Sequence, residues 1–143
     1  MLNDTEIAEL SKKSILISKN FDENCLTPNG YDLRIDNIMP GEYIKSNSVF
    51  FVSSYEEINM PDDVIGLLFI RSSFARKGIF GSFGVVDAGY KGNLTLSFYN
   101  ALNDIKLERY TRIVQIIFER IKKPEKTYSE RSGNYHGKTG INL

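Results

Sequence analysis

The sequence has few of the residues that build metal centres and covalent cross-links. It contains one cysteine, Cys25, one histidine, His136, and no tryptophan. One chain of this kind cannot assemble a zinc site from cysteine and histidine ligands, which excludes the zinc-dependent deaminases. A single cysteine also excludes a disulfide framework within the chain.

Charge of one sign and long hydrophobic runs are missing as well. The 18 lysines and arginines balance 18 aspartates and glutamates, so there is no basic excess of the kind that wraps nucleic acid. No apolar run approaches the roughly 18–20 residues that cross a bilayer, and residues 1–4 do not resemble a signal peptide. We therefore expect a cytoplasmic protein that binds neither nucleic acid nor membranes, with a local phosphate site still possible.

The remaining composition is that of one globular domain, with 143 residues of which 41% are hydrophobic and 25% charged. Asn3 as a cap and Glu6 in capping-box position predict a short helix that begins at Asn3 and ends near Lys13. Residues 125–143 are polar and contain several glycines, which is typical of a mobile tail. We expect this tail to follow a folded domain of residues 1–124.

After the predicted N-terminal helix, the helical spacing of apolar residues disappears, and short runs rich in β-branched and aromatic residues follow. The predicted strands are residues 14–18, 31–35, 48–53, 64–70, 94–100 and 112–121. Turns that contain proline, glycine, asparagine or aspartate separate these runs. Many short strands at this spacing predict an all-β sandwich or barrel without internal repeats.

Residues 71–78 form the first of three polar stretches that a β core does not need. Arg71, serine hydroxyls and free backbone N–H groups follow an apolar strand directly, an arrangement that suits an anion such as phosphate. The local pattern fits equally well a turn or helix start that Ser72 caps, with Arg76 exposed to solvent. The pattern alone leaves both interpretations open.

Residues 84–92 form the second stretch, where Asp87 ends one strand and two glycines precede the next. A hairpin mouth with one carboxylate and one aromatic, Tyr90, could hold a sugar and a base. An ordinary hairpin with an aspartate turn is the more frequent meaning of such a pattern. No P-loop occurs, and Gly78, Gly81 and Gly84 lack the helix that a dinucleotide site needs.

The third stretch, residues 131–140, lies in the tail. Its ordinary interpretation is a disordered glycine-rich segment with one exposed histidine. However, an aromatic ring between cations on glycine hinges can also close as a lid over a nucleotide. Arg131 and Lys138 would supply the cations, and an aromatic residue of the same stretch would supply the ring.

Taken together, five stretches resemble the motifs of the dUTPase/dCTP deaminase superfamily, in the family's order and along nearly the whole chain. They are residues 29–41, 71–78, 84–92, 112–116 and 131–140. The resemblance implies a distorted jelly roll of the dUTPase-like β-clip type with a short N-terminal helix. It also implies a homotrimer whose active sites are shared between subunits.

The resemblance also implies roles for single residues. Asp32 would interact with Mg²⁺ through bound water, and the phosphate chain would meet the residues Arg71, Ser72, Ser73, Arg76 and Gln115. Asp87 would contact the deoxyribose and activate the attacking water, and Tyr90 would pack under the sugar. His136 stands where the family's tail stacks an aromatic on the base, with Arg131 and Lys138 nearby.

Position 97 bears on the choice between the two branches of the superfamily. The N-terminal residues and Arg76 look more like the deaminase branch, but deaminases carry a glutamate ten residues after the aspartate matched by Asp87. Here this position is Ser97, whose hydroxyl cannot shuttle protons near neutral pH. The sequence therefore predicts a dUTP diphosphatase that uses Mg²⁺ to hydrolyse dUTP to dUMP and pyrophosphate. The alternatives are a dCTP deaminase, a bifunctional dCTP deaminase/dUTPase, and a non-catalytic nucleotide-binding regulator.

Overall fold

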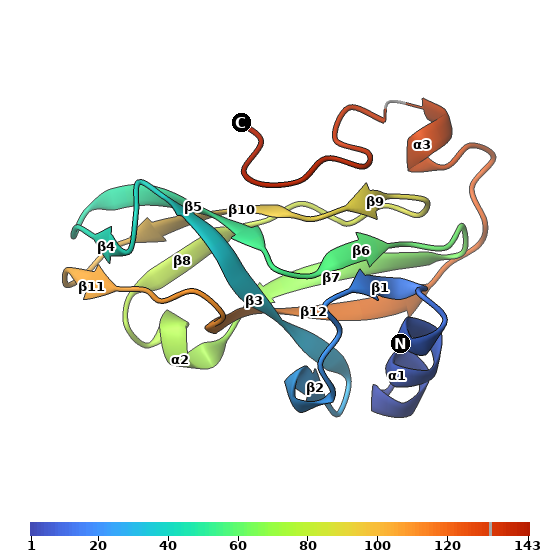
Figure 1. Cartoon of the computed structure of the whole chain (residues 1–143), viewed down its shortest axis with the longest axis horizontal. Coiled ribbons are helices and arrows are strands. Elements are labelled where there is room, and N and C mark those ends of the chain that lie inside the picture. Colours follow the sequence, from blue (N-terminus) through green and yellow to red (C-terminus); the bar gives the residue numbers. More distant parts are fainter. Residues whose placement is uncertain (132) are drawn as a thin grey trace.

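Runs of isoleucine, valine, phenylalanine and tyrosine form the strands of the structure, a computed structural model that describes residues 1–131 and 133–143 (Figure 1). The strands of the main sheet follow the order β7-β12-β3-β5-β10-β8, and β2 pairs with β3 at its side. Two smaller sheets have the orders β1-β6-β9 and β11-β4. All the paired strands are antiparallel, and the fold is all-β and jelly-roll-like, as the sequence predicts.

The strand bounds agree with the predicted runs to within four residues, and short strands lie between them. In chain order they are β1 (Leu16–Lys19), β2 (Leu26–Thr27), β3 (Gly30–Met39), β4 (Tyr43–Ile44), β5 (Ser48–Ser54), β6 (Glu57–Asn59), β7 (Val64–Ile70), β8 (Ile79–Ser82), β9 (Lys91–Gly92), β10 (Thr95–Asn100), β11 (Ile105–Lys106) and β12 (Arg112–Arg120). The helical elements are α1 (Asp4–Lys12), η1 (Glu23–Cys25), α2 (Ser72–Ala75) and α3 (Tyr128–Arg131).

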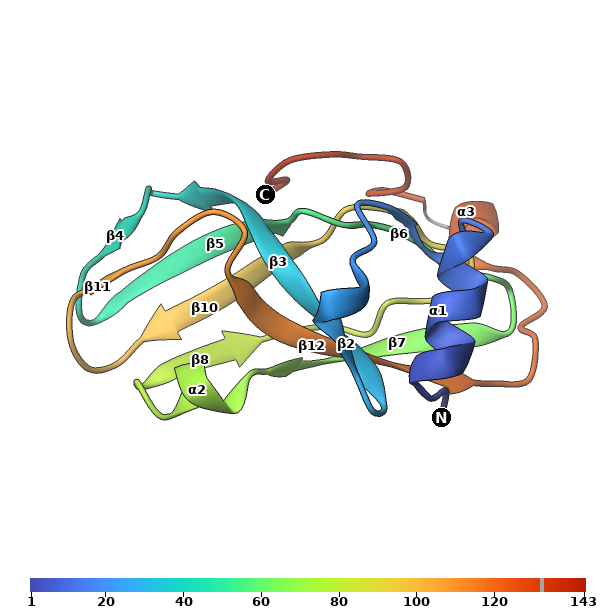
Figure 2. The same cartoon turned by 60° about the horizontal axis from the view of Figure 1, so that its bottom comes forward.

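The N-terminal helix α1 is confirmed together with its capping box. The Glu6 backbone N–H donates to Asn3 Oδ1 at 2.9 Å, and the Asn3 N–H donates to Glu6 Oε1 at 3.3 Å. These two bonds satisfy backbone donors that the first helical turn leaves without partners. The helix buries Ile7 completely and lies beside β1 and β2 at one end of the molecule (Figure 2). Within the described residues, none of the helices has the length and hydropathy needed to span a bilayer.

Side chains of the main sheet alternate between a buried core and an outer face. Phe98 lies opposite Phe50 in the β10–β5 ladder, and the two buried rings stack with centroids 5.0 Å apart. Successive residues of a strand point to opposite faces, so Ser97 and its partner Phe51 lie on the outer face. The same alternation decides which candidate site residues can meet.

Candidate functional site

One group of candidate residues surrounds the buried carboxylate of Asp32 on β3. Arg71, directly after β7, places its Nε atom 3.0 Å from Asp32 Oδ2 and donates from NH1 to the Arg112 carbonyl at 3.0 Å. The guanidinium of Arg112, at the start of β12, lies 3.8 Å from the same carboxylate oxygen. Burial raises the pKa of Asp32, and the two arginines oppose that rise. Two cations around one carboxylate leave an excess positive charge, which suits a phosphate group.

Gln115 joins this group because β3 and β12 approach each other closely. Gln115 pairs with Asp32 across the ladder, and its Nε2 donates to Thr27 Oγ1 at 2.7 Å. A Cβ atom on Gly30 would lie 2.6 Å from the Ile116 carbonyl oxygen, so glycine permits the approach. The chain continues from Arg71 into α2, where the described side chains of three predicted residues are exposed, namely Ser72, Ser73 and Arg76. We call Asp32, Arg71, Arg112 and Gln115 the arginine group.

A second group lines a pocket of about 410 Å³ between residues 82–87, the start of β10 and the tail. Its apolar wall contains Leu68, Phe83, Leu94 and Leu96. Asp87 is exposed and is the single carboxylate among the described lining residues. The polar wall further contains Tyr90, Asn93, Tyr128, Tyr135 and Asn142. The volume lies within the range of about 300–1,000 Å³ that is usual for small-molecule sites.

Tyr90 forms the base of this pocket under the tail. Its side chain is 8% exposed, and its hydroxyl donates to the Asn93 carbonyl at 2.5 Å. The ring of Tyr128 meets it edge to face, with centroids 5.2 Å apart. Burial, then the neighbouring Tyr128 and Glu57, raise the pKa of Tyr90 to about 12. This hydroxyl therefore stays protonated at neutral pH.

The tail runs beside β9 and the start of β10 of its own chain (Figure 1), and two of its residues, Tyr135 and Asn142, line the pocket. The Gly137 N–H donates to the Lys91 carbonyl, and Asn93 donates from its backbone to Lys138 O and from its side chain to Gly140 O, each at 3.3 Å. The Asn142 N–H donates to Thr95 Oγ1 at 3.0 Å. Residues 137–142 thus run beside residues 91–95.

The tail residues that the sequence proposed as ligands are all exposed, namely Arg131, His136 and Lys138. Tyr135, and not His136, lines the pocket, although the His136 ring lies 6.5 Å from that of Tyr128. The stacking role of His136 stays a prediction. Ser132, which belongs to the fifth motif, lies outside the described residues.

The arginine group and the pocket do not meet within one chain. Gln115 pairs with the exposed Phe69, whereas Leu68, next along β7, faces the pocket. Alternation along β7 therefore places the two groups on opposite faces of the sheet. In both views the tail and α2 lie on opposite sides of the molecule (Figures 1 and 2).

Sequence reasoning missed several residues of both groups. It gave no role to Tyr128, Asn93 or Asn142, which line the pocket, because polar tail residues carry no periodic signal. Arg112 was part of a quoted motif, but its contact with Asp32 depends on the register of β3 and β12. Ser97 is half-buried and donates from Oγ to the Ser82 carbonyl at 3.0 Å. At the position where the deaminase branch carries a glutamate, this chain therefore has a serine hydroxyl that binds the neighbouring strand β8.

The described residues do not build a protein cage for Mg²⁺. Residues 1–131 and 133–143 hold no cluster of three acidic, histidine or cysteine side chains that could coordinate a metal ion. The carboxylate of Asp32 is 4% exposed and already bound to Arg71, so it offers little room for direct coordination. Mg²⁺ would therefore be held mainly by the phosphates of the substrate.

Comparison with known proteins places the chain among nucleotide enzymes. The model of the dCTP deaminase-like family matches residues 37–121. A dCTP deaminase from Pyrococcus horikoshii is 43% identical over 91% of this chain and 90% of its own length. The solved 2'-deoxycytidine 5'-triphosphate deaminase from Agrobacterium tumefaciens matches with a TM-score of 0.73 at 24% identity, over 85% of this chain and 48% of that chain. A dUTPase from phage phi11 of S. aureus, described with a structural Mg(II) ion, matches with a TM-score of 0.59 at 19% identity, over 70% of this chain and 82% of that chain.

These findings correct the predicted activity. The sequence favoured a dUTP diphosphatase because Ser97 replaces a glutamate, and this prediction is wrong, since the Pyrococcus relative, alike over nine tenths of both chains, is named dCTP deaminase. Ser97 is a single position, whereas the sequence identity to the dCTP deaminase extends over nine tenths of both chains. The identity over the whole chain therefore outweighs the one missing glutamate.

Proposed function

The chain belongs to the family of dCTP deaminase-like proteins, and we propose that it converts dCTP and water to dUTP and ammonia. One observation carries the proposal: the 43% identity to a named dCTP deaminase extends over nine tenths of both chains. The family match over residues 37–121 also contains Arg71, Asp87 and Gln115, and so reaches both groups of the site.

The chemistry requires one proton acceptor near the base. Water adds to C4 of cytosine, so a C4–O bond forms, the C4=N3 double bond becomes a single bond, and one proton of the water ends on N3. The C4–N4 bond then breaks as the second proton of the water reaches the amino group, which leaves as ammonia. Asp87, the single carboxylate among the described pocket residues, would take the proton from water and return it to the departing amine. The Ser97 hydroxyl is bound to the Ser82 carbonyl and is not acidic enough for this task. The apolar wall suits an uncharged base.

The triphosphate would lie against the arginine group, with Ser72, Ser73 and Arg76 beside it. Since that group and the pocket open on opposite faces, one chain cannot hold both ends of a nucleotide. We therefore propose a homotrimer in which the pocket of one subunit faces the arginine group of another. Light scattering should then give about 49 kDa, three times the chain mass of 16.3 kDa. A monomer at micromolar concentration would contradict the shared site.

The tail would cover the bound nucleotide. His136 would stack on the base, and Arg131 and Lys138 would meet the phosphates. The contacts of residues 137–142 with residues 91–95 support this role, because they hold the tail above the pocket.

Product analysis with dCTP tests the proposal. We expect equal amounts of dUTP and ammonia, and Asp87→Asn should lower kcat by about 10²–10⁴-fold while nucleotide binding persists. Asp63→Asn is the matched control, because Asp63 is not among the described residues that line the pocket and its carboxylate has a loose ion pair with Arg120, at 3.8 Å. That variant should keep wild-type turnover.

Two results would overturn the proposed function, and a third would overturn the role of Asp87. Release of pyrophosphate without ammonia would show hydrolysis of the triphosphate in place of deamination. Binding of dCTP without any product would indicate a non-catalytic regulator. Full activity of Asp87→Asn would remove Asp87 from the proton transfer.

A further inference from the structure

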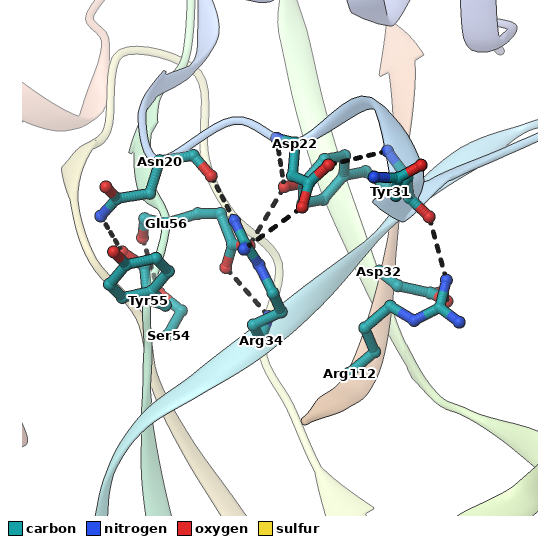
Figure 3. A network of polar contacts seen from close by, with 10 residues as sticks. Asn20, Asp22, Tyr31, Asp32, Arg34, Ser54, Tyr55, Glu56 and Arg112 are labelled. Carbon is teal, nitrogen blue, oxygen red and sulfur yellow. Dashed lines mark hydrogen bonds and ion pairs between the residues drawn. The ribbon is translucent and has the colours of Figure 1, made fainter. Parts of the chain in front are cut away.

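A buried carboxylate that does not line the pocket has no part in the proposed reaction. Glu56, between β5 and β6, is 0% exposed and accepts bonds from Arg34 Nε at 2.8 Å, the Arg34 N–H at 2.9 Å and the Tyr31 hydroxyl at 3.1 Å (Figure 3). A fully buried charge is tolerated only when it is paired and hydrogen-bonded. Glu56 therefore fixes the guanidinium of Arg34 in one orientation.

The other end of that guanidinium reaches the segment before η1. Arg34 NH2 donates to the Asn20 carbonyl, and NH1 lies 3.5 Å from Asp22 Oδ2. Asp22 in turn caps η1, because its Oδ1 accepts from the Asn24 N–H at 2.9 Å. The position of η1 is thus set by Asp22, and Asp22 is held by Arg34.

The same short helix, η1, also contacts Arg112 of the arginine group. The Asn24 carbonyl accepts from Arg112 NH1 at 3.1 Å. The same NH1 atom lies 3.8 Å from Asp32 Oδ2, and Figure 3 shows Arg112 beside Asp32. An unbroken series of contacts thus connects Glu56 with Asp32 through Arg34, η1 and Arg112. Arg112 is exposed and would otherwise have many orientations available.

We propose that Arg34 and Asp22 are positioning residues that orient Arg112 for binding an oligophosphate. The inference rests on the proposed function only for the identity of the anion as the triphosphate of a nucleotide. It goes beyond a structural role, because a cap that merely stabilises η1 would leave the affinity for phosphate unchanged.

Titration calorimetry with inorganic tripolyphosphate, on the full-length assembled protein, separates the two roles. Asp22 is 37% exposed, so Asp22→Ala should fold, and we expect it to weaken binding roughly three- to tenfold. Arg112→Met should weaken binding at least tenfold, and the double variant should bind no worse than Arg112→Met alone. Asp22→Asn, which keeps an oxygen for the Asn24 N–H, should show a smaller loss than Asp22→Ala.

Asn3→Ala is the matched control. Asn3 also caps a helix with its side-chain oxygen, and loss of either cap should lower stability to a similar extent. Only loss of Asp22, however, should change the affinity for tripolyphosphate, since Asn3 has no contact with the arginine group.

The inference fails if Asp22→Ala binds tripolyphosphate like wild type, or if the losses of Asp22→Ala and Arg112→Met multiply in the double variant. It also fails if wild type does not bind tripolyphosphate, or if Arg112→Met binds it as tightly as wild type. Tripolyphosphate carries no base, so these results do not depend on deamination. Coupled losses without ammonia release from dCTP would overturn the proposed function alone. Ammonia release without coupling would overturn this inference alone.

Discussion

Replacement of Tyr90 by phenylalanine should produce a stability difference that reverses with pH. The Tyr90 hydroxyl is buried and donates to the Asn93 carbonyl, and burial raises its pKa from 10.0 to about 12. At neutral pH the variant loses this bond and leaves the carbonyl without its partner. We therefore expect Tyr90→Phe to be less stable than wild type by about 1–2 kcal/mol near pH 8.

Alkaline pH should reverse this order. Because the folded pKa is the higher one, folded wild type holds a proton that the unfolded chain has lost between about pH 10 and pH 12. Wild-type stability is therefore fully present below the unfolded pKa and falls as pH rises toward the folded pKa. The full rise is worth about 3 kcal/mol, of which about 2.3 kcal/mol is lost by pH 12, so Tyr90→Phe should become the more stable protein by about 0.3–1.3 kcal/mol near pH 12.

Urea unfolding of both proteins, followed by circular dichroism over this pH range, measures the difference directly. Titration of the other tyrosines and lysines affects both proteins alike, so it cancels when the two free energies of unfolding are subtracted. A difference that stays constant with pH would show that the Tyr90 hydroxyl is not buried as the structure describes.

The remaining predictions concern the tail and residues 91–95, which the tail contacts. Deletion of residues 133–143 should lower kcat/KM for dCTP at least tenfold while the melting temperature changes little, because the tail contributes few apolar contacts; equal losses in both would contradict a lid. His136→Phe should keep most of the activity and His136→Ala should lose roughly tenfold, as expected for stacking, and an inactive His136→Phe would refute that role. Gly92→Ala should destabilise the protein by about 1–3 kcal/mol in urea, because Gly92 has a φ of +143°, which an L residue rarely adopts, and a Cβ there would lie 3.0 Å from the Tyr90 hydroxyl; a melting curve like that of wild type would contradict this backbone conformation.

The fold was predictable where the sequence carries local periodicity. Residues 64–70 are bounded as predicted, and residues 48–53 and 112–121 differ from β5 and β12 by one residue each. Strands of two residues, such as β9 and β11, could not be predicted, because they exist only through pairing with distant segments. The tail is a further example, since its bonds to residues 91–95 are formed by polar atoms of a segment without hydrophobic pattern.

The candidate site was predictable as a set of residues but not as an arrangement. Family motifs named Asp32, Arg71 and Gln115 one by one, and the structure places them side by side, because β3 and β12 pair and Arg71 follows the end of β7. Their roles toward a ligand stay predictions. Nothing in the sequence indicated that Asp87 would open on the opposite face. That separation depends on strand register, because a shift of one residue would move Gln115 to the other side of the sheet.

Because the sequence does not show which side chains share a face of the sheet, Ser97 alone led to the wrong prediction of a dUTP diphosphatase. A missing glutamate argues against deamination only if no other carboxylate can approach the base, and a sequence does not say which side chains share a pocket. In the structure Leu96, the neighbour of Ser97, lines the same pocket as Asp87, while Ser97 itself binds the Ser82 carbonyl. A proton acceptor is therefore available in the pocket although position 97 supplies none. The comparison of Asp87→Asn with Asp63→Asn consequently tests the step on which the sequence argument failed.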